Sequence, residues 1–193
     1  MHRLSSSFVL GYHGCDKQVG ENLIAGLDFK PSKNDYDWLG PGIYFLEANP
    51  QRGQEFAEEI KALDRGPKIK TPWVVGAVID LGLCLDLTTS AGIQQVHESY
   101  STLRKLTKSG GYVLPSNNKD LLRRNLDCAV IETLHRVRKD KGLPPVDTVR
   151  GIFVEGEAIY KDSGFFEKTH IQICVCNYQS VKGVFRVPSH QLS

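Results

Sequence analysis

Hydrophobic and polar positions recur along this chain with two different periods, and each change of period marks a predicted element. Apolar residues at helical spacing predict helices over 17–26, 50–63, 93–106 and 119–142. Short runs rich in β-branched and aromatic residues predict strands over 6–14, 43–47, 71–81, 149–156, 157–160, 168–177 and 181–187. Strands and helices alternate early and strands cluster late, which favours one α+β domain with mostly antiparallel pairing over a doubly wound sheet.

The helix over 50–63 carries the clearest local signals. Asn49 suits the N-cap and Pro50 the first helical position, and Phe56 and Ile60 then recur at helical spacing. No long linker or internal repeat interrupts the chain, so we expect a single domain over residues 1–193.

Composition narrows the class of protein but not its partner. The chain is 40% hydrophobic and 24% charged, and no run approaches the roughly 20 apolar residues of a membrane span. The apolar run "FVLGY" is too short for the core of a signal peptide, so a cytoplasmic protein without a membrane partner is expected. Lys and Arg together exceed Asp and Glu by only two, 24 against 22, which gives no electrostatic reason to expect nucleic acid.

The cysteines point to reduced thiols. Their number, five, is odd, and neither a Cys-x-x-Cys pair nor a zinc-type histidine pair occurs. We therefore expect no disulfide framework and no metal.

Three short motifs carry the candidate chemistry. In "GYHGC", residues 11–15, two glycines flank a tyrosine and a histidine, as where a ligand approaches the backbone closely. "DWLGPGIYF", residues 37–45, is a glycine-rich loop that enters a strand. In "FFEKTHIQICV", residues 165–175, His170 and Gln172 share one face of a strand and need partners or a ligand. Ordinary core packing and an internal hydrogen-bond network are the alternatives at each place.

In this order the motifs resemble the ADP-ribosyltransferases of the diphtheria-toxin and poly(ADP-ribose) polymerase type. The resemblance implies a split antiparallel β-sandwich with a central NAD cleft, and a helical insertion at about 89–142. It places His13 on a ribose hydroxyl of NAD and the backbone of Gly14 on the nicotinamide carboxamide. Tyr44 and Phe56 would lie against the nicotinamide ring, and Tyr12 would line the same NAD site.

The family has a glutamate where this chain has Gln172. A glutamine amide can hydrogen-bond the ribose, but it carries no charge and cannot act as a base. The target could supply the activation, or Glu155, Glu157 or Glu167 could substitute. Alternatively, the fold could retain NAD binding without catalysis. We expect transfer of single ADP-ribose units, with His13, Tyr44 and Gln172 as the catalytic residues.

The loop before the third motif occupies the place of the family's target-recognition loop. Phe165, Phe166, Glu167 and His170 are therefore the candidate target contacts, unless the two phenylalanines fold inward. The expected substrates are NAD and a macromolecular acceptor, protein or nucleic acid. An intracellular toxin or phage-defence effector fits this description, and a toxin would need an antitoxin or immunity partner.

Other readings compete with the transferase. They are an NAD glycohydrolase, a non-catalytic NAD or ADP-ribose binding module, and removal of a 2-phosphate from RNA. The last would use arginines such as Arg52, Arg123 and Arg124.

Overall fold

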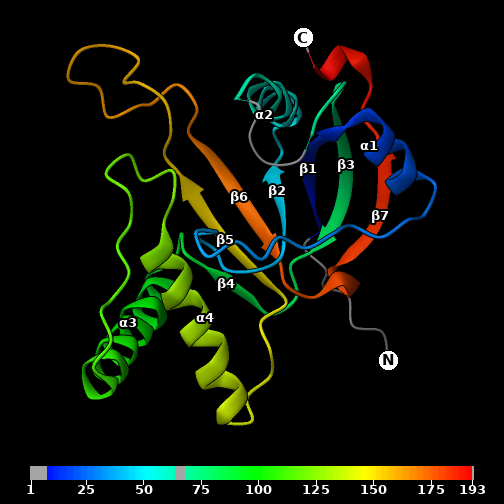
Figure 1. Ribbon diagram of the computed structural model, residues 1–193. Helices are drawn as coiled ribbons and strands as arrows, with labels where there is room; N and C mark the ends of the chain where they lie inside the picture. Colours follow the sequence, from blue (N-terminus) through cyan, green and yellow to red (C-terminus); the bar gives the residue numbers. More distant parts are fainter. Residues whose placement is uncertain (1–7, 64–67, 193) are drawn as a thin grey trace.

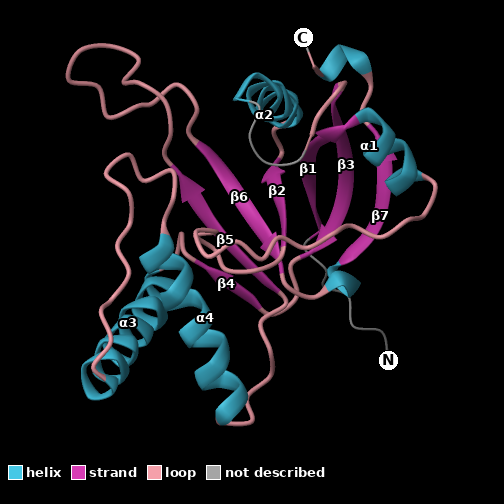
Figure 2. Cartoon of the chain, in the orientation of Figure 1, coloured by secondary structure: helices cyan, strands magenta, loops and turns pink. Residues whose placement is uncertain are grey.

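Seven strands, four α-helices and two short 3₁₀ helices, Tyr178–Ser180 and Ser189–Gln191, make up the fold in the computed structural model, which describes residues 8–63 and 68–192 (Figures 1 and 2). The strands are β1 (Phe8–Asp16), β2 (Ile43–Glu47), β3 (Pro72–Asp80), β4 (Cys84–Asp86), β5 (Thr148–Phe153), β6 (His170–Val175) and β7 (Val181–Arg186). The helices are α1 (Lys17–Ile24), α2 (Pro50–Leu63), α3 (Ser90–Gly110) and α4 (Asn125–Asp140). Within the described ranges, no helix has the length and apolar content that crossing a membrane requires.

All seven strands belong to one sheet, in the order β4-β5-β6-β2-β1-β3-β7. Neighbouring strands are antiparallel except β4 and β5, which are parallel. The α+β class with mostly antiparallel pairing is therefore confirmed. Both long helices, α3 and α4, lie between β4 and β5 in the sequence, inside the range where helices were expected.

Among the described strands, the pairing between β1 and β2 involves the fewest residues. These strands share two residue pairs, Gly11 with Glu47 and Tyr12 with Leu46, whereas β1 and β3 share nine. Beyond Tyr12 the two strands separate. The halves β4-β5-β6-β2 and β1-β3-β7 are thus joined by a short strip.

Strand register assigns the motif side chains to two faces. Tyr12 pairs with Leu46 and Leu46 pairs with Gln172, so these three side chains share the face that we call the helical face. Phe45 pairs with Ile173 on the opposite, core face. Side chains alternate along a strand, and His13 therefore points to the core face.

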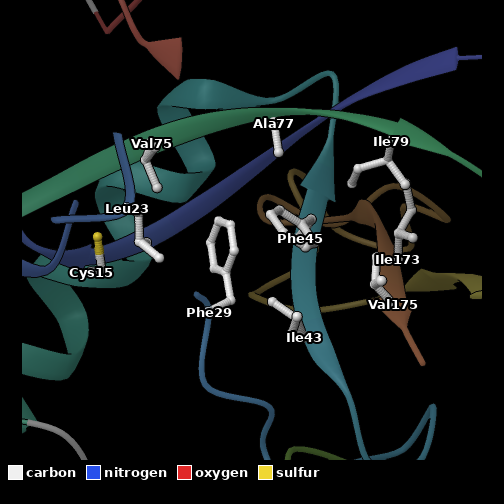
Figure 3. Close-up of a cluster of buried hydrophobic side chains, with 10 residues drawn as sticks. All are labelled: Cys15, Leu23, Phe29, Ile43, Phe45, Val75, Ala77, Ile79, Ile173 and Val175. Carbon is white, nitrogen blue, oxygen red and sulfur yellow. The ribbon is translucent and has the colours of Figure 1, made fainter. Parts of the chain in front are cut away.

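The core face holds a cluster of buried apolar side chains (Figure 3). Phe45 and Ile173 are fully buried there, and Phe29 reaches in from the loop between α1 and β2. Full burial of such a side chain stabilises the fold by roughly 1.5–3 kcal/mol. This cluster holds β1, β2, β3 and β6 together.

On the helical face, α2 packs against β1 and β3 through glycines. A Cβ built on Gly14 would collide with the main-chain oxygen of Gly53, and one on Gly53 would lie 2.7 Å from Val74 Cγ2. The buried face of α2 is not the apolar stripe that the sequence predicts. The helix buries Arg52, Gly53 and Ala57, whereas Phe56 is exposed. The close approach depends on small residues rather than on large apolar ones.

The other end of the helical face lies under α4. Ile131 and Leu134 of α4 pack with Val149 of β5 and Cys174 of β6. Helix α3 is attached to α4 by the hydroxyl of Ser99, which donates to the carbonyl of Val130 at 2.7 Å.

Two predicted elements differ from the structure. Residues 119–124 are not helical, because the Asn117 side chain accepts from the amides of Leu126 and Asp127 and caps a helix that begins at Asn125. Residues 157–160 form no strand beyond the single bridge of Ala158 with Phe166. Strand β4 was not predicted, since three residues carry too little pattern.

Candidate functional site

The three motifs lie on adjacent strands. β6 carries Gln172, β2 carries Tyr44, and β1 carries His13 and Gly14, in the order β6-β2-β1. Tyr44 and Gln172 share the helical face, whereas the His13 side chain starts from the core face. The backbones therefore meet, but the three side chains do not point to one side.

His13 reaches the gap between β1 and β2. Its Nδ1 lies 2.8 Å from the main-chain oxygen of Tyr44, and its ring contacts Phe29 and Phe45 at centroid distances of 5.4 and 5.8 Å. Because a carbonyl only accepts, Nδ1 carries the hydrogen and Nε2 is an acceptor without a partner among the described residues. Burial lowers the pKa of His13, although the hydrogen bond to Tyr44 partly offsets this.

Gly14 presents its backbone to the same gap. The carbonyl of Leu10 accepts from the amide of Ala48 on the β2 side, and backbone groups alternate along a strand. Gly14, four residues on, directs its N–H and C=O to that side, beyond the last β1–β2 pair. The neighbouring Tyr12 is 5% exposed, and its ring contacts Phe185 edge-on at 6.2 Å.

The Tyr44 side chain is fixed by two hydrogen bonds at its hydroxyl and by packing of its ring. Its hydroxyl donates to the carbonyl of Gly40 at 2.8 Å and accepts from the amide of Leu39 at 3.1 Å. The ring packs against the cluster beneath α4, and burial raises the pKa of the phenol. Among the described residues, Tyr44 makes no ring contact with Phe56, which is 43% exposed on α2.

Gln172 lies at the centre of a hydrogen-bond chain. Its Oε1 accepts from the indole Nε1 of Trp38 at 2.7 Å, and its Nε2 lies 2.9 Å from Nε2 of His170. Nδ1 of His170 donates to the carbonyl of Lys168 at 2.6 Å, so His170 Nε2 accepts from Gln172. Burial lowers the pKa of His170, as suits a neutral ring. Each end of the Gln172 amide thus has one protein partner.

An ion cluster centred on the buried Arg52 links α2 to the segments that follow β5 and precede β6. The Arg52 side chain, 4% exposed, bonds both oxygens of Glu59 at 3.1 Å and Glu155 at 2.9 Å. Lys168 donates to Glu59 at 2.9 Å. Of the three carboxylates considered as substitutes, Glu155 is the one that this cluster holds, and its charge acts on His170.

The candidate target contacts near the loop over 154–169 differ in their exposure to solvent. Phe165 and Phe166 are 66% and 37% exposed, so they do not fold inward, and Glu167 is exposed as well. His170 is only 6% exposed and is the first residue of β6. It therefore belongs to the Gln172 network rather than to the exposed loop.

Trp38 and Arg124 also belong to the site, although the sequence did not single out their roles there. Gly151 lies opposite Gln172 in the sheet, and the Trp38 ring occupies the space that a side chain would fill. The Arg124 guanidinium lies over the rings of Trp38 and Phe153, at 4.8 and 4.6 Å. In the sequence, the weak signal for this arrangement is Gly151, because a glycine beside a polar strand residue leaves room for an aromatic ring to pack over the sheet.

A hollow of about 520 Å³ lies elsewhere, at the start of α1, where Asp16, Lys17, Lys68 and Thr71 contribute to its lining. The Asp16 carboxylate already accepts from three backbone amides there, including that of Thr71. The motif side chains His13, Tyr44 and Gln172 do not line this hollow. The candidate site is therefore the region around these three residues and not the hollow. Within the described residues, no three His, Cys, Asp or Glu side chains gather as a metal site would require.

Comparison with known proteins adds a short match. No family model and no solved structure matches the chain. A stretch of 36 residues is 44% identical to part of an uncharacterized protein of Methanocaldococcus jannaschii, MJ0359. The match covers 19% of this chain and 17% of that protein.

Proposed function

We propose that this protein is a mono-ADP-ribosyltransferase that cleaves NAD and transfers ADP-ribose to a macromolecule. The observation that carries the proposal is the separation of β1 and β2 beside His13 and Gly14. Strand β2, at the edge of this separation, is the neighbour of β6, which carries Gln172. This narrow junction supports the split sandwich that the motif resemblance implies.

The polar groups at this separation suit the dinucleotide. The amide and carbonyl of Gly14 match the acceptor and donor of a carboxamide. Nε2 of His13 can accept from a ribose hydroxyl, since Nδ1 is committed to Tyr44. In the proposed reaction the ribose–nicotinamide bond breaks, its electron pair leaves with nicotinamide, and the acceptor attacks the ribose carbon. Gln172, one strand away and on the other face of the sheet, keeps a second amide hydrogen for a ligand, but it takes no proton.

The proton of the acceptor therefore needs another base. Glu155 lies just beyond β5, where its carboxylate accepts from Arg52 at 2.9 Å, and β5 pairs with β6, the strand that carries Gln172. A Glu155 carboxylate that serves the acceptor, rather than the ribose, is consistent with single transfers.

The direct test is incubation with NAD labelled in its adenylate part together with cell lysate, while free nicotinamide is measured. The proposal expects nicotinamide release and label that either protease or nuclease removes, with both lost in His13→Ala. His97→Ala, an exposed position on α3, is the matched control and should retain both. Release without macromolecular label would instead indicate an NAD glycohydrolase.

A non-catalytic NAD or ADP-ribose binding module is the second candidate. It is favoured by the Gln172 amide, whose two ends are hydrogen-bonded to Trp38 and His170. This hydrogen-bonded network of three side chains contains no carboxylate. Saturable ADP-ribose binding without nicotinamide release would select this module over the transferase.

A further inference from the structure

Among residues 8–63 and 68–192, the side chains of Arg52, Arg124 and Arg150 are largely buried, and that of Arg124 differs from the other two. The Arg52 and Arg150 side chains, 4% and 17% exposed, each bond carboxylates at 3.2 Å or less. The Arg124 side chain is 12% exposed, yet the carboxylate paired with it, that of Asp127, lies 4.0 Å away and is 39% exposed. A buried charge without a close counter-ion is costly unless something else compensates it.

The contacts of Arg124 satisfy only part of its guanidinium. Nε donates to the carbonyl of Leu121 at 2.7 Å, and the planar group lies over Trp38 and Phe153. Cation–π contacts stabilise the charge through the flat faces of the rings. They leave the terminal nitrogens, Nη1 and Nη2, without a hydrogen-bond acceptor among the described residues.

The surroundings of Arg124 favour an anion. Arg123, the next residue, lies over the ring of Tyr36 at 4.9 Å and adds a second positive charge. The pKa of Arg124 is lowered by burial, in contrast to the pKa values of Arg52 and Arg150, which carboxylates raise. Its platform also touches the motif network, since Trp38 donates to Gln172.

We propose that Arg124 binds a nucleotide phosphate, which its two terminal nitrogens grip on the Trp38–Phe153 platform beside Gln172. Guanidinium and phosphate match in a two-point hydrogen-bonded geometry, whereas an ammonium does not. The anion site follows from the two terminal nitrogens of Arg124 and the distance of its counter-ion, and only its assignment to a nucleotide rests on the proposed function. The phosphate belongs either to the dinucleotide or to a nucleic-acid acceptor.

Calorimetric titration with ADP-ribose, and separately with a single-stranded oligoribonucleotide, tests the proposal. Arg124→Gln should weaken binding of at least one ligand by about tenfold or more, as expected for a charge-assisted hydrogen bond. Arg124→Lys should fall between Arg124→Gln and the native protein, and Arg136→Gln, at an exposed position of α4 outside the proposed site, should stay within about twofold. The ligand that depends on Arg124 identifies the source of the phosphate.

Two further readouts keep the outcome decisive. If Arg124→Gln does not fold, the guanidinium NMR signals of Arg124 in the native protein should still shift on addition of inorganic pyrophosphate. Unchanged binding of both ligands by a folded Arg124→Gln protein, or unmoved signals, would overturn the site. Nicotinamide release by the native protein is measured separately, so the anion site and the transferase proposal fail or succeed independently.

Discussion

The imidazole of His13 donates a hydrogen bond from Nδ1 to the main-chain carbonyl of Tyr44, 2.8 Å away, where β1 and β2 stop pairing. This bond replaces the backbone pairing that the two strands no longer make. His13 therefore has a structural role, holding the separation in shape, besides the role proposed for its Nε2.

Removal of this link should cost stability. His13→Ala leaves the Tyr44 carbonyl without its partner and opens space between Phe29 and Phe45, so we expect a loss of roughly 1–3 kcal/mol. Urea denaturation measures it. His97→Ala should stay within about 0.5 kcal/mol, and equal stability of the two variants would contradict the structural role.

Stability should fall with pH below neutrality. Burial lowers the pKa values of His13 and His170, so the unfolded chain, with histidine near pKa 6.5, takes up protons that the folded protein refuses. The stabilisation is complete above about pH 6.5 and is lost as the pH falls toward the folded pKa values, by at most about 1.4 kcal/mol per pH unit for each histidine. Urea denaturation at pH 7.5 and 5.5 checks this. His170→Asn should show a smaller difference between the two pH values, and an unchanged difference would argue against the buried neutral ring.

Gln172→Glu should convert His170 into a cation. Nδ1 of His170 must keep its hydrogen for the Lys168 carbonyl, and a carboxylate at 172 would call for a second hydrogen on Nε2. We therefore expect the pKa of His170 to rise, as ring NMR signals followed against pH would report. Gln95→Glu, exposed on α3, adds the same charge elsewhere and should leave His170 unchanged. If the site is a transferase, nicotinamide release should also increase in Gln172→Glu, because the carboxylate stabilises positive charge at the ribose.

Gly14 should tolerate no side chain. A Cβ there meets the carbonyl of Gly53, so Gly14→Ala must push α2 away from β1, at a cost of about 1–3 kcal/mol. Gly183→Ala on β7 meets nothing within 4 Å and should be neutral or slightly stabilising. Thermal melts of both variants, compared with the native protein, measure the contrast. A Gly14→Ala protein as stable as Gly183→Ala would show that α2 is not closely packed there.

The exposed phenylalanines should affect target labelling but not folding. Phe165→Ser removes a side chain that is 66% exposed, so stability should change by less than about 0.5 kcal/mol while labelling of the acceptor falls. Val113→Ser, at a position that is 92% exposed on another loop, is the control. Nicotinamide release in the absence of acceptor should be the same in both variants, and undiminished labelling by Phe165→Ser would remove this loop from target recognition.

The sequence by itself determined the α+β class and most of the elements, although not the strand β4 or the start of α4. Periodicity and end signals predicted β2 over its full length and α2 from Pro50, because these preferences act between residues close in the chain. Alternation along β6 likewise predicted that His170 and Gln172 share a face, and the register agrees.

Only the tertiary structure decided what surrounds those residues. Trp38 reaches Gln172 across 134 positions of sequence, and Arg52 meets Glu155 across 103. Such contacts depend on strand order and on where a glycine leaves room, which no local pattern encodes. For the same reason, the sequence could name His13 only as a candidate site residue and could not reveal that its ring holds the Tyr44 backbone from the opposite face of the sheet.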